Sequence, residues 1–349
     1  MTQARPPTLC ALALVAVTLV VARADDTGLV HRLTVRSEHD TVFFGYALDA
    51  DGDTVVIGDY NGACTERGPC HGDVRIYGAT RDGLVEQARF HGDEDTLGFE
   101  VAIDGDRAAA SLNRRVRIFE RGRDRRWYET ATIEMGDCAN RSLEAITLAG
   151  DYLITLALDR ICVWTPKAGT WRLDGDLGTG AIVDGKLAAA GNTIAIAWRD
   201  KNQVALYRRG LAGWRRVETI AVERPFGLAL QGTTLAVQTN HTIQLFDVAR
   251  APRLVATLAP QSEPADWKYG AELALDDRML VAWSDDGLHV YRRSGERWAA
   301  AGVVASPLAG RTWFGARLAL TPHWLWVGDP REDPHPTPGG LVYGFERRR

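Results

Sequence analysis

The chain has 349 residues and a formal net charge of −4, and neither charged nor apolar residues dominate its composition. Domains that bind nucleic acid or anionic membranes without further specificity are usually basic, so this mildly acidic balance argues against both partners. Beyond the N-terminal segment, no apolar run approaches the roughly 20 residues needed to cross a bilayer. We therefore expect a globular protein that neither binds nucleic acid nor inserts into a membrane.

The N-terminal segment has the three parts of a secretory signal peptide. Residues 9–21 form an uncharged apolar run, preceded by Arg5 and followed by the small residues Ala22 and Ala24. The run is about 13 residues long, which is too short to span a membrane and is typical of the central part of a signal peptide. The sequence thus predicts a signal peptide over residues 1–24 and a mature protein that is secreted, periplasmic or displayed at the cell surface.

Four cysteines follow this segment, an even number that suits disulfide bonding in an exported chain. Cys64 and Cys70 are close together in a stretch containing Gly and Pro, so we predict a disulfide that clips one loop. Cys138 and Cys162 either form a second disulfide or remain separate thiols, with Cys162 buried as a small apolar residue.

The rest of the chain is a sevenfold repeat of short strands. Alternating runs of Val, Ile, Leu, Trp and Tyr are interrupted by Gly, Asp and Asn, a pattern typical of strands joined by tight turns. Each unit opens with a strand that leads through such a turn into a second strand. The units recur every ~41–53 residues, the spacing of propeller blades. In chain order they open near Phe44, Leu97, Leu143, Gly185, Phe226, Tyr269 and Phe314.

Each unit continues into a third strand that ends with an aromatic residue, and in most units an outer strand follows. The third strands end at Tyr77, Phe119, Trp164, Tyr207, Phe246, Tyr291 and Tyr343, and the outer strands contain Trp127, Trp171, Trp214 and Trp298, which we interpret as packing residues. The seventh unit stops after its third strand, near Phe345, whereas residues 29–35 resemble an outer strand that precedes the first unit. The sequence therefore predicts an all-β, seven-bladed β-propeller over residues 25–349, closed by an N-terminal strand that completes the last blade.

The motifs of these units resemble the FG-GAP family, which includes the propeller of integrin α-subunits. Phe-Gly opens units at Phe44-Gly45 and Phe314-Gly315, and Gly-Asp-Pro follows at residues 328–330. The resemblance extends over nearly all of residues 29–345, and it implies a seven-bladed propeller used for adhesion or ligand binding.

Propellers of the integrin type carry calcium loops of the form Asp-x-Asp-x-Asp-Gly. The nearest match here is residues 49–53, which lie where the other repeats have an ordinary hairpin turn, such as residues 149–151. Tight hairpins favour Asp and Gly whether or not a metal is bound, so we interpret this segment as a turn. We expect no cofactor: calcium is compatible with the sequence but is not implied by it.

In a four-stranded blade, the connections alternate between the two faces of the ring. We call the face with the loops between second and third strands and the connections between blades the loop face, and the opposite face the arginine face. The turns of the arginine face are rich in arginine, which we interpret as solvated turns, with a binding surface as the alternative. These residues are Arg121, Arg123, Arg125, Arg126, Arg208, Arg209, Arg292, Arg293 and Arg347 to Arg349.

The loop face of blades 7, 1 and 2 gathers histidines and carboxylates, and it carries the two longest predicted loops, residues 60–72 and 329–339. Long loops on a rigid scaffold commonly carry binding residues. Histidine and carboxylate groups also suit metal ions, so a surface with or without a metal remains open. The candidate binding residues are His39, Asp59, His71, Asp73, His91, Asp329, Glu332, Asp333 and His335.

No nucleophile elbow, zinc-protease motif or phosphate-binding loop occurs in the sequence. The first hypothesis is therefore a monomeric, secreted, non-catalytic scaffold that binds a protein or glycan partner through this face. The alternative is a secreted hydrolase or lyase, which would need at least three of the candidate residues within ~5 Å of one another to reach one substrate atom. Glycosylation sequons begin at Asn140 and Asn240 and matter only in a eukaryotic source.

Overall fold

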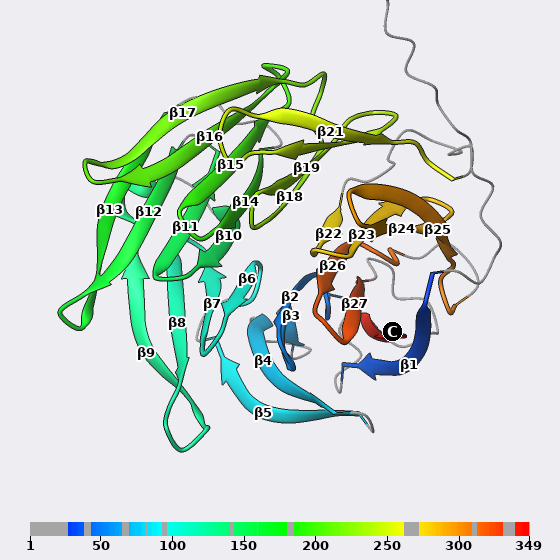
Figure 1. The fold of residues 1–349 in the computed structure, drawn as a ribbon. Coiled ribbons are helices and arrows are strands. Elements are labelled where there is room, and N and C mark those ends of the chain that lie inside the picture. Colours follow the sequence, from blue (N-terminus) through cyan, green and yellow to red (C-terminus); the bar gives the residue numbers. More distant parts are fainter. Residues whose placement is uncertain are drawn as a thin grey trace, which may run out of the picture.

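The computed structural model of the chain is an all-β propeller of seven antiparallel four-stranded sheets (Figure 1). It describes residues 27–37, 43–64, 70–80, 83–92, 96–139, 143–158, 160–179, 185–261, 272–308, 313–330 and 339–348, so the predicted signal peptide lies outside the described residues. Apart from strands, the described residues contain one short 3₁₀ turn, η1 (Gly136–Cys138). No described helix is long and apolar enough to span a membrane.

The first three blades follow one another in chain order, each with its strands arranged from the inside of the ring outward. Blade 1 contains β2 (Ala47–Asp51), β3 (Thr54–Cys64), β4 (Cys70–Thr80) and β5 (Gly83–His91). Blade 2 contains β6 (Val101–Asp104), β7 (Arg107–Leu112), β8 (Arg115–Arg121) and β9 (Trp127–Glu134). Blade 3 contains β10 (Leu143–Ala149), β11 (Tyr152–Ala157), β12 (Arg160–Lys167) and β13 (Thr170–Thr179).

Three further blades repeat this arrangement. Blade 4 contains β14 (Lys186–Ala190), β15 (Thr193–Trp198), β16 (Gln203–Gly210) and β17 (Gly213–Ala221). Blade 5 contains β18 (Gly227–Gln231), β19 (Thr234–Gln238), β20 (Ile243–Asp247) and β21 (Arg253–Leu258). Blade 6 contains β22 (Leu273–Leu275), β23 (Met279–Ser284), β24 (Gly287–Ser294) and β25 (Arg297–Val304).

Blade 7 joins the two ends of the chain, as the sequence predicts. Its inner strands are β26 (Arg317–Leu320), β27 (Trp324–Asp329) and β28 (Leu341–Arg347), and its outer strand is β1 (Leu29–Arg36). β1 runs antiparallel to β28 from the pair Leu29–Arg347 to the pair Arg36–Leu341, and Figure 1 shows it at the outer side of this blade. The seventh sheet therefore has no missing strand, and the ring is closed.

Apolar residues on both sides of the middle strands form the core between blades. Val55, Val56 and Ile57 in β3 have no exposed surface, because neighbouring sheets cover both faces of their blade. The seam between blades 1 and 7 is sealed in the same way, since Val55 shares a cluster with the fully buried Trp326. The outer-strand residue Trp127 is likewise buried against blade 1, which confirms its predicted packing role.

Pairs of glycines let the start of one blade approach the middle of the preceding blade. A Cβ atom on Gly58 would lie 2.1 Å from the carbonyl oxygen of Gly98, and one on Gly328 would lie 2.3 Å from that of Gly45. Gly45 and Gly98 also adopt positive φ angles of 82° and 87°, which disfavour other residues. The Phe44-Gly45 and Leu97-Gly98 turns thus each pack on a glycine in the second strand of the blade before it, whereas the Phe314-Gly315 turn packs on the Trp283 side chain of blade 6.

The acidic segment at residues 49–53 is a hairpin turn that fastens blade 1 to blade 2. Asp49 Oδ2 accepts a hydrogen bond from the Ile103 backbone N–H at 2.9 Å, and Asp51 Oδ2 accepts one from Gly105 at 2.7 Å. Burial raises the pKa of Asp49 to about 7, although these backbone donors oppose the shift. Both carboxylates are therefore occupied by the neighbouring blade.

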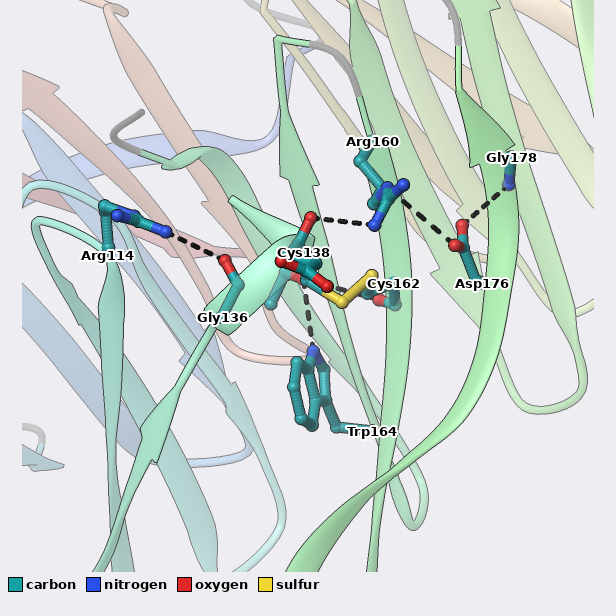
Figure 2. Close-up of a disulfide and its surroundings, with 10 residues drawn as sticks. Arg114, Gly136, Cys138, Arg160, Cys162, Trp164, Asp176 and Gly178 are labelled. Atoms are coloured by element: carbon teal, nitrogen blue, oxygen red, sulfur yellow. Dashed lines mark hydrogen bonds and ion pairs between the residues drawn. A yellow bond between two sulfur atoms is a disulfide. The ribbon is translucent and has the colours of Figure 1, made fainter. Parts of the chain in front are cut away.

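Cys138 and Cys162 form a disulfide, which decides between the two alternatives left open by the sequence. Figure 2 shows this bond tying η1, in the connection from blade 2 to blade 3, to the third strand of blade 3. The Arg114 side chain donates to the Gly136 carbonyl at 2.9 Å, which attaches η1 to blade 2 as well. The disulfide and this arginine together secure the junction between two blades.

The connection between β3 and β4 is shorter than the predicted loop over residues 60–72. The strands continue beyond an irregularity and pair again at Ala63–His71 and Cys64–Cys70. Strand pairing can resume wherever backbones stay in register, even though the local sequence has the polar composition of a loop. The side chains of Cys64 and Cys70 lie outside the described residues, so their disulfide stays a prediction.

Candidate binding site on the loop face

One repeat position places charged side chains at the start of the inner strands, where they meet near the axis of the ring. This position lies five residues before the turn position held by Gly52 in blade 1. Four blades have a charged residue there and three have a small one. In blade order the residues are Ala47, Glu100, Ala145, Lys186, Gly227, Glu272 and Arg317.

The four charged residues form a continuous network across the ring. Arg317 contacts Glu100 at 2.7 Å and Glu272 at 4.0 Å, and Lys186 lies 3.8 Å from the same Glu272. Since the intervening blades have Ala47 and other small residues at this position, side chains from non-adjacent blades can meet. We call Glu100, Lys186, Glu272 and Arg317 the charge network, which has a formal charge of zero.

Within the charge network, burial and ion pairing shift the pKa values in opposite directions. Burial raises the pKa of Glu100, whereas the nearby guanidinium of Arg317 opposes that shift. Burial lowers the pKa of Arg317, but the two glutamates outweigh it and raise the pKa above its usual value. The mutual pairing therefore keeps Arg317 charged in a partly enclosed position.

Four aromatic side chains cluster beside this network on the loop face, and we call them the aromatic patch: Phe43, Tyr46, Tyr60 and Phe99. The Tyr60 ring lies 4.6 Å from Phe43, 5.1 Å from Tyr46 and 5.3 Å from Phe99 between ring centroids. All four side chains are partly exposed. The rings contact one another without being sealed from solvent.

Two equivalent turns supply most of the aromatic patch. In the turn before β2 the Tyr46 N–H donates to the Phe43 carbonyl at 3.0 Å, and in the turn before β6 the Phe99 N–H donates to the Thr96 carbonyl at 3.1 Å. Tyr60 comes from β3, which lies between these turns. These two glycine-containing turns, which pack one blade on another, thus also hold the aromatic rings in place.

The aromatic patch and the charge network are continuous. The Arg317 guanidinium lies over the Tyr46 ring, 5.4 Å from its centroid. In blade 7, Trp313 occupies the turn position that Phe43 holds in blade 1, and its side chain is 44% exposed. Blade 7 thus also carries an exposed aromatic residue on the loop face, at the equivalent turn.

Three of the predicted site residues form a row across blade 1. Asp59 pairs with Asp73 across β3 and β4, and Asp73 pairs with His91 across β4 and β5. The Asp73 carboxylate contacts His91 Nδ1 at 2.8 Å, with the buried Arg75 guanidinium 3.9 Å away. Both carboxylates are almost fully buried, and only His91 is exposed. The row consequently offers little acidic surface to a ligand.

The other candidate residues do not join this row into one cluster. His71 is partly exposed in β4, whereas Asp329 is buried in blade 7 and accepts a hydrogen bond from the Tyr343 hydroxyl at 3.4 Å. Within the described part of the chain, no group of three His, Cys, Asp or Glu residues could hold a metal ion. The remaining candidates lie outside the described residues: His39, Glu332, Asp333 and His335.

The sequence predicts a site on the loop face of blades 7, 1 and 2, but neither the aromatic patch nor the charge network is among the predicted candidates. A signal for both was present in the aligned repeats. Tyr46 and Phe99 precede the position at which four blades carry charges and the others carry Ala or Gly. When an inner-strand position is charged in some blades and small in others, the fold of the blade does not require the charged residues there.

Several side chains of the arginine face are paired within the fold, whereas Arg123, Arg125 and Arg126 are exposed. Arg121 lies 3.5 Å from Asp106, Arg209 contacts Asp174 at 2.9 Å, and Arg347 bonds to Asp276 of the preceding blade. Arginines that fasten neighbouring turns in this way are less available to a partner. This observation favours the loop face as the binding surface.

No family model and no curated protein matches this sequence. Similar solved structures include a protein from Lactobacillus plantarum, with 12% identity over 75% of this chain and 85% of that chain and a TM-score of 0.56. A chain of the mitotic checkpoint complex has 14% identity, with 96% and 100% coverage and a TM-score of 0.62. The WD40 repeats of RRP9 have 12% identity, with 91% and 100% coverage and a TM-score of 0.60. At these identities the likeness shows the fold alone: the chain is a seven-bladed β-propeller with WD40 repeats among its structural neighbours.

Proposed function

We propose that this protein is an exported, non-catalytic scaffold that binds a protein or glycan partner through the loop face of blades 7, 1 and 2. The observation that carries the proposal is the aromatic patch, together with the exposed Trp313 at the equivalent turn of the neighbouring blade 7. Aromatic side chains supply much of the binding energy at interfaces, and the fold of a propeller does not require them at its surface.

The closed ring makes this surface suitable for recognition. The rings of the aromatic patch are held by short turns and by strand β3, so a partner would meet a surface that is already ordered. Binding to such a surface costs less conformational entropy than binding to a flexible loop. The buried row of Asp59 and Asp73 would then support the scaffold while the aromatic side chains contact the partner.

Export and family membership belong to the same proposal. The Cys138–Cys162 disulfide supports export, because structural disulfides persist mainly in oxidising compartments. The packing of Gly45 on Gly328 supports membership of the FG-GAP family, since it brings a Phe-Gly motif into contact with the Gly-Asp-Pro motif. Membership of this family does not by itself imply that the protein requires calcium.

Partner capture followed by affinity measurement on two matched variants tests the function. In the first variant, Trp313→Ala and Tyr60→Ala remove two rings from the loop face. In the second, Arg123→Ala and Arg126→Ala remove two exposed side chains from the arginine face. We expect binding to fall at least tenfold in the first variant and to stay unchanged in the second. The reverse order would move the binding surface to the arginine face.

A further inference from the structure

We propose that the aromatic patch binds an uncharged glycan, with sugar rings stacked on the aromatic rings and hydroxyl groups bonded to the charge network. This inference rests on the proposed binding function and names the chemical class of the partner. The shape of the patch, the charges beside it and the hydrogen-bonding capacity of those charged groups all favour this class of ligand.

The shape of the patch favours a ligand that lies on the rings. Tyr60 contacts Phe43, Tyr46 and Phe99 at centroid distances of 4.6 to 5.3 Å, so the rings fill the space between them. Tyr60 stands edge-on to Tyr46 and Phe99, at interplanar angles of 73° and 71°, whereas Tyr46 and Phe99 are tilted by only 36° to each other. The rings thus pack into one cluster and do not surround a hollow in the manner of a cage for a cation. A sugar ring presents a flat array of C–H groups that can lie against the partly exposed rings of this cluster through dispersion and weak C–H contacts.

The charges beside the patch favour a ligand without net charge. Two acidic and two basic residues make up the charge network, so a polyanion or polycation would meet as much repulsion as attraction. Arg317 contacts both the aromatic patch and the charge network, because its guanidinium lies over Tyr46 and pairs with Glu100. A ligand stacked on Tyr46 would therefore lie next to this ion pair.

The hydrogen-bonding capacity of the network distinguishes a glycan from a proline-rich peptide, which also prefers aromatic surfaces. Glu100 and Glu272 can only accept hydrogen bonds, whereas Arg317 can only donate them. Sugar hydroxyls both donate and accept, so they can bond to Arg317 and Glu272, the two partly exposed groups; Glu100 is buried and already accepts from Arg317. A proline-rich segment offers mainly carbonyl acceptors and would desolvate Glu272 without giving it a donor.

The chain offers a matched control for the aromatic patch. Phe226 holds the same repeat position in blade 5 that Tyr46 and Phe99 hold in blades 1 and 2, and it is also partly exposed. Its ring is covered by the Arg199 guanidinium at 4.0 Å and it does not belong to the patch. Removing Phe226 should therefore change a similar amount of surface without changing the proposed site.

The test uses the mature chain on an array of neutral oligosaccharides built from glucose, mannose, galactose or N-acetylglucosamine, with sialylated and sulfated glycans and a proline-rich peptide on the same array. We expect at least one neutral oligosaccharide to bind, with affinity reduced about tenfold by Tyr60→Ala or Phe99→Ala. Phe226→Ala should bind like the wild type. Tyr60→Phe should retain most of the affinity because it keeps the ring, and thermal melting of each variant verifies its fold.

Three results would overturn the glycan proposal: no neutral oligosaccharide binds, only charged glycans or the peptide bind, or neutral binding is indifferent to Tyr60→Ala and Phe99→Ala. The proposed function is tested separately. If a protein partner binds and is lost with Trp313→Ala and Tyr60→Ala, the binding function stands although the glycan class is wrong. If every partner is indifferent to loop-face substitutions, both proposals are wrong.

Discussion

At the scale of single residues, neighbouring blades are joined by groups whose substitution has a specific cost. Gly58 leaves room for the carbonyl oxygen of Gly98, and Asp49 accepts a backbone hydrogen bond from Ile103 of the next blade. Neither contact could be read from one repeat, because each joins residues of two blades. Both give predictions with clear physical causes.

Gly58→Ala should lower the free energy of unfolding by about 3 kcal/mol, because its Cβ would lie 2.1 Å from a backbone oxygen and the blades must separate to accommodate it. Gly210→Ala is the matched control, since no atom lies within 4 Å of its added Cβ and its φ angle is not positive. That change should stay within about 0.5 kcal/mol. Denaturant unfolding of both variants provides the measurement, and equal effects would show that the contact between Gly58 and Gly98 does not limit packing.

Asp49 should make stability fall as the pH rises from about 4 to about 7. Its pKa is raised from 3.8 to about 7 in the folded state, so the folded protein holds this proton over that range whereas the unfolded chain releases it. The stabilising contribution is thus complete below pH ~4 and is lost as the pH passes the folded-state pKa. The difference in unfolding free energy between wild type and Asp49→Asn, measured across this range, isolates the contribution. A difference that does not change with pH, or that increases with pH, would contradict the assignment.

At the scale of elements, the sequence predicts strands well because each depends on a local pattern. Alternation, turn residues and a terminal aromatic residue mark the strands within every repeat, and the missing strand of blade 7 identifies β1. The extension of β3 to Cys64 is not predictable in this way, since it depends on pairing with β4. The site is also only partly predictable from the sequence. Loop length indicates the face on which it lies, but Arg317 and Glu100 are 217 residues apart and meet only in the closed ring.

Deleting residues 29–36 should abolish cooperative unfolding and cause aggregation, because β28 would lose its partner and expose a strand edge. A synthetic peptide of residues 27–37, added in excess, should restore a single melting transition by occupying the vacant edge. The deletion variant is measured by calorimetry and light scattering with and without the peptide. An unchanged melting profile and monomeric state after deletion would contradict the closure role of β1.

Replacing both Cys138 and Cys162 by Ser should lower the free energy of unfolding by about 3.5 kcal/mol, the loop-entropy value for a disulfide with a sequence separation of 24. The melting temperature should fall by about 5 °C for a domain of this size. Both cysteines are buried, so the wild type should resist reducing agents while folded. The melting of the double variant is compared with that of wild type whose disulfide was reduced in the unfolded state, and the two should agree. A loss of unfolding free energy below about 1 kcal/mol would contradict the expected value.

At the scale of the whole molecule, the two faces of the ring differ in what they leave available. On the arginine face, side chains such as Arg347 bond to turns of neighbouring blades. On the loop face, the aromatic patch and Trp313 remain partly open to solvent beside a charge network that is neutral overall. The proposal that a partner binds the loop face rests on this difference in available chemistry.

Hydrogen exchange of the protein with and without its bound partner tests this claim most directly, because it maps protection over the backbone of both faces in one measurement. We predict slower exchange on binding at residues 43–46, 58–60, 96–100 and 313–317, with no change at residues 121–127 and 292–297. Protection confined to the second set would contradict the account and place the binding surface on the arginine face.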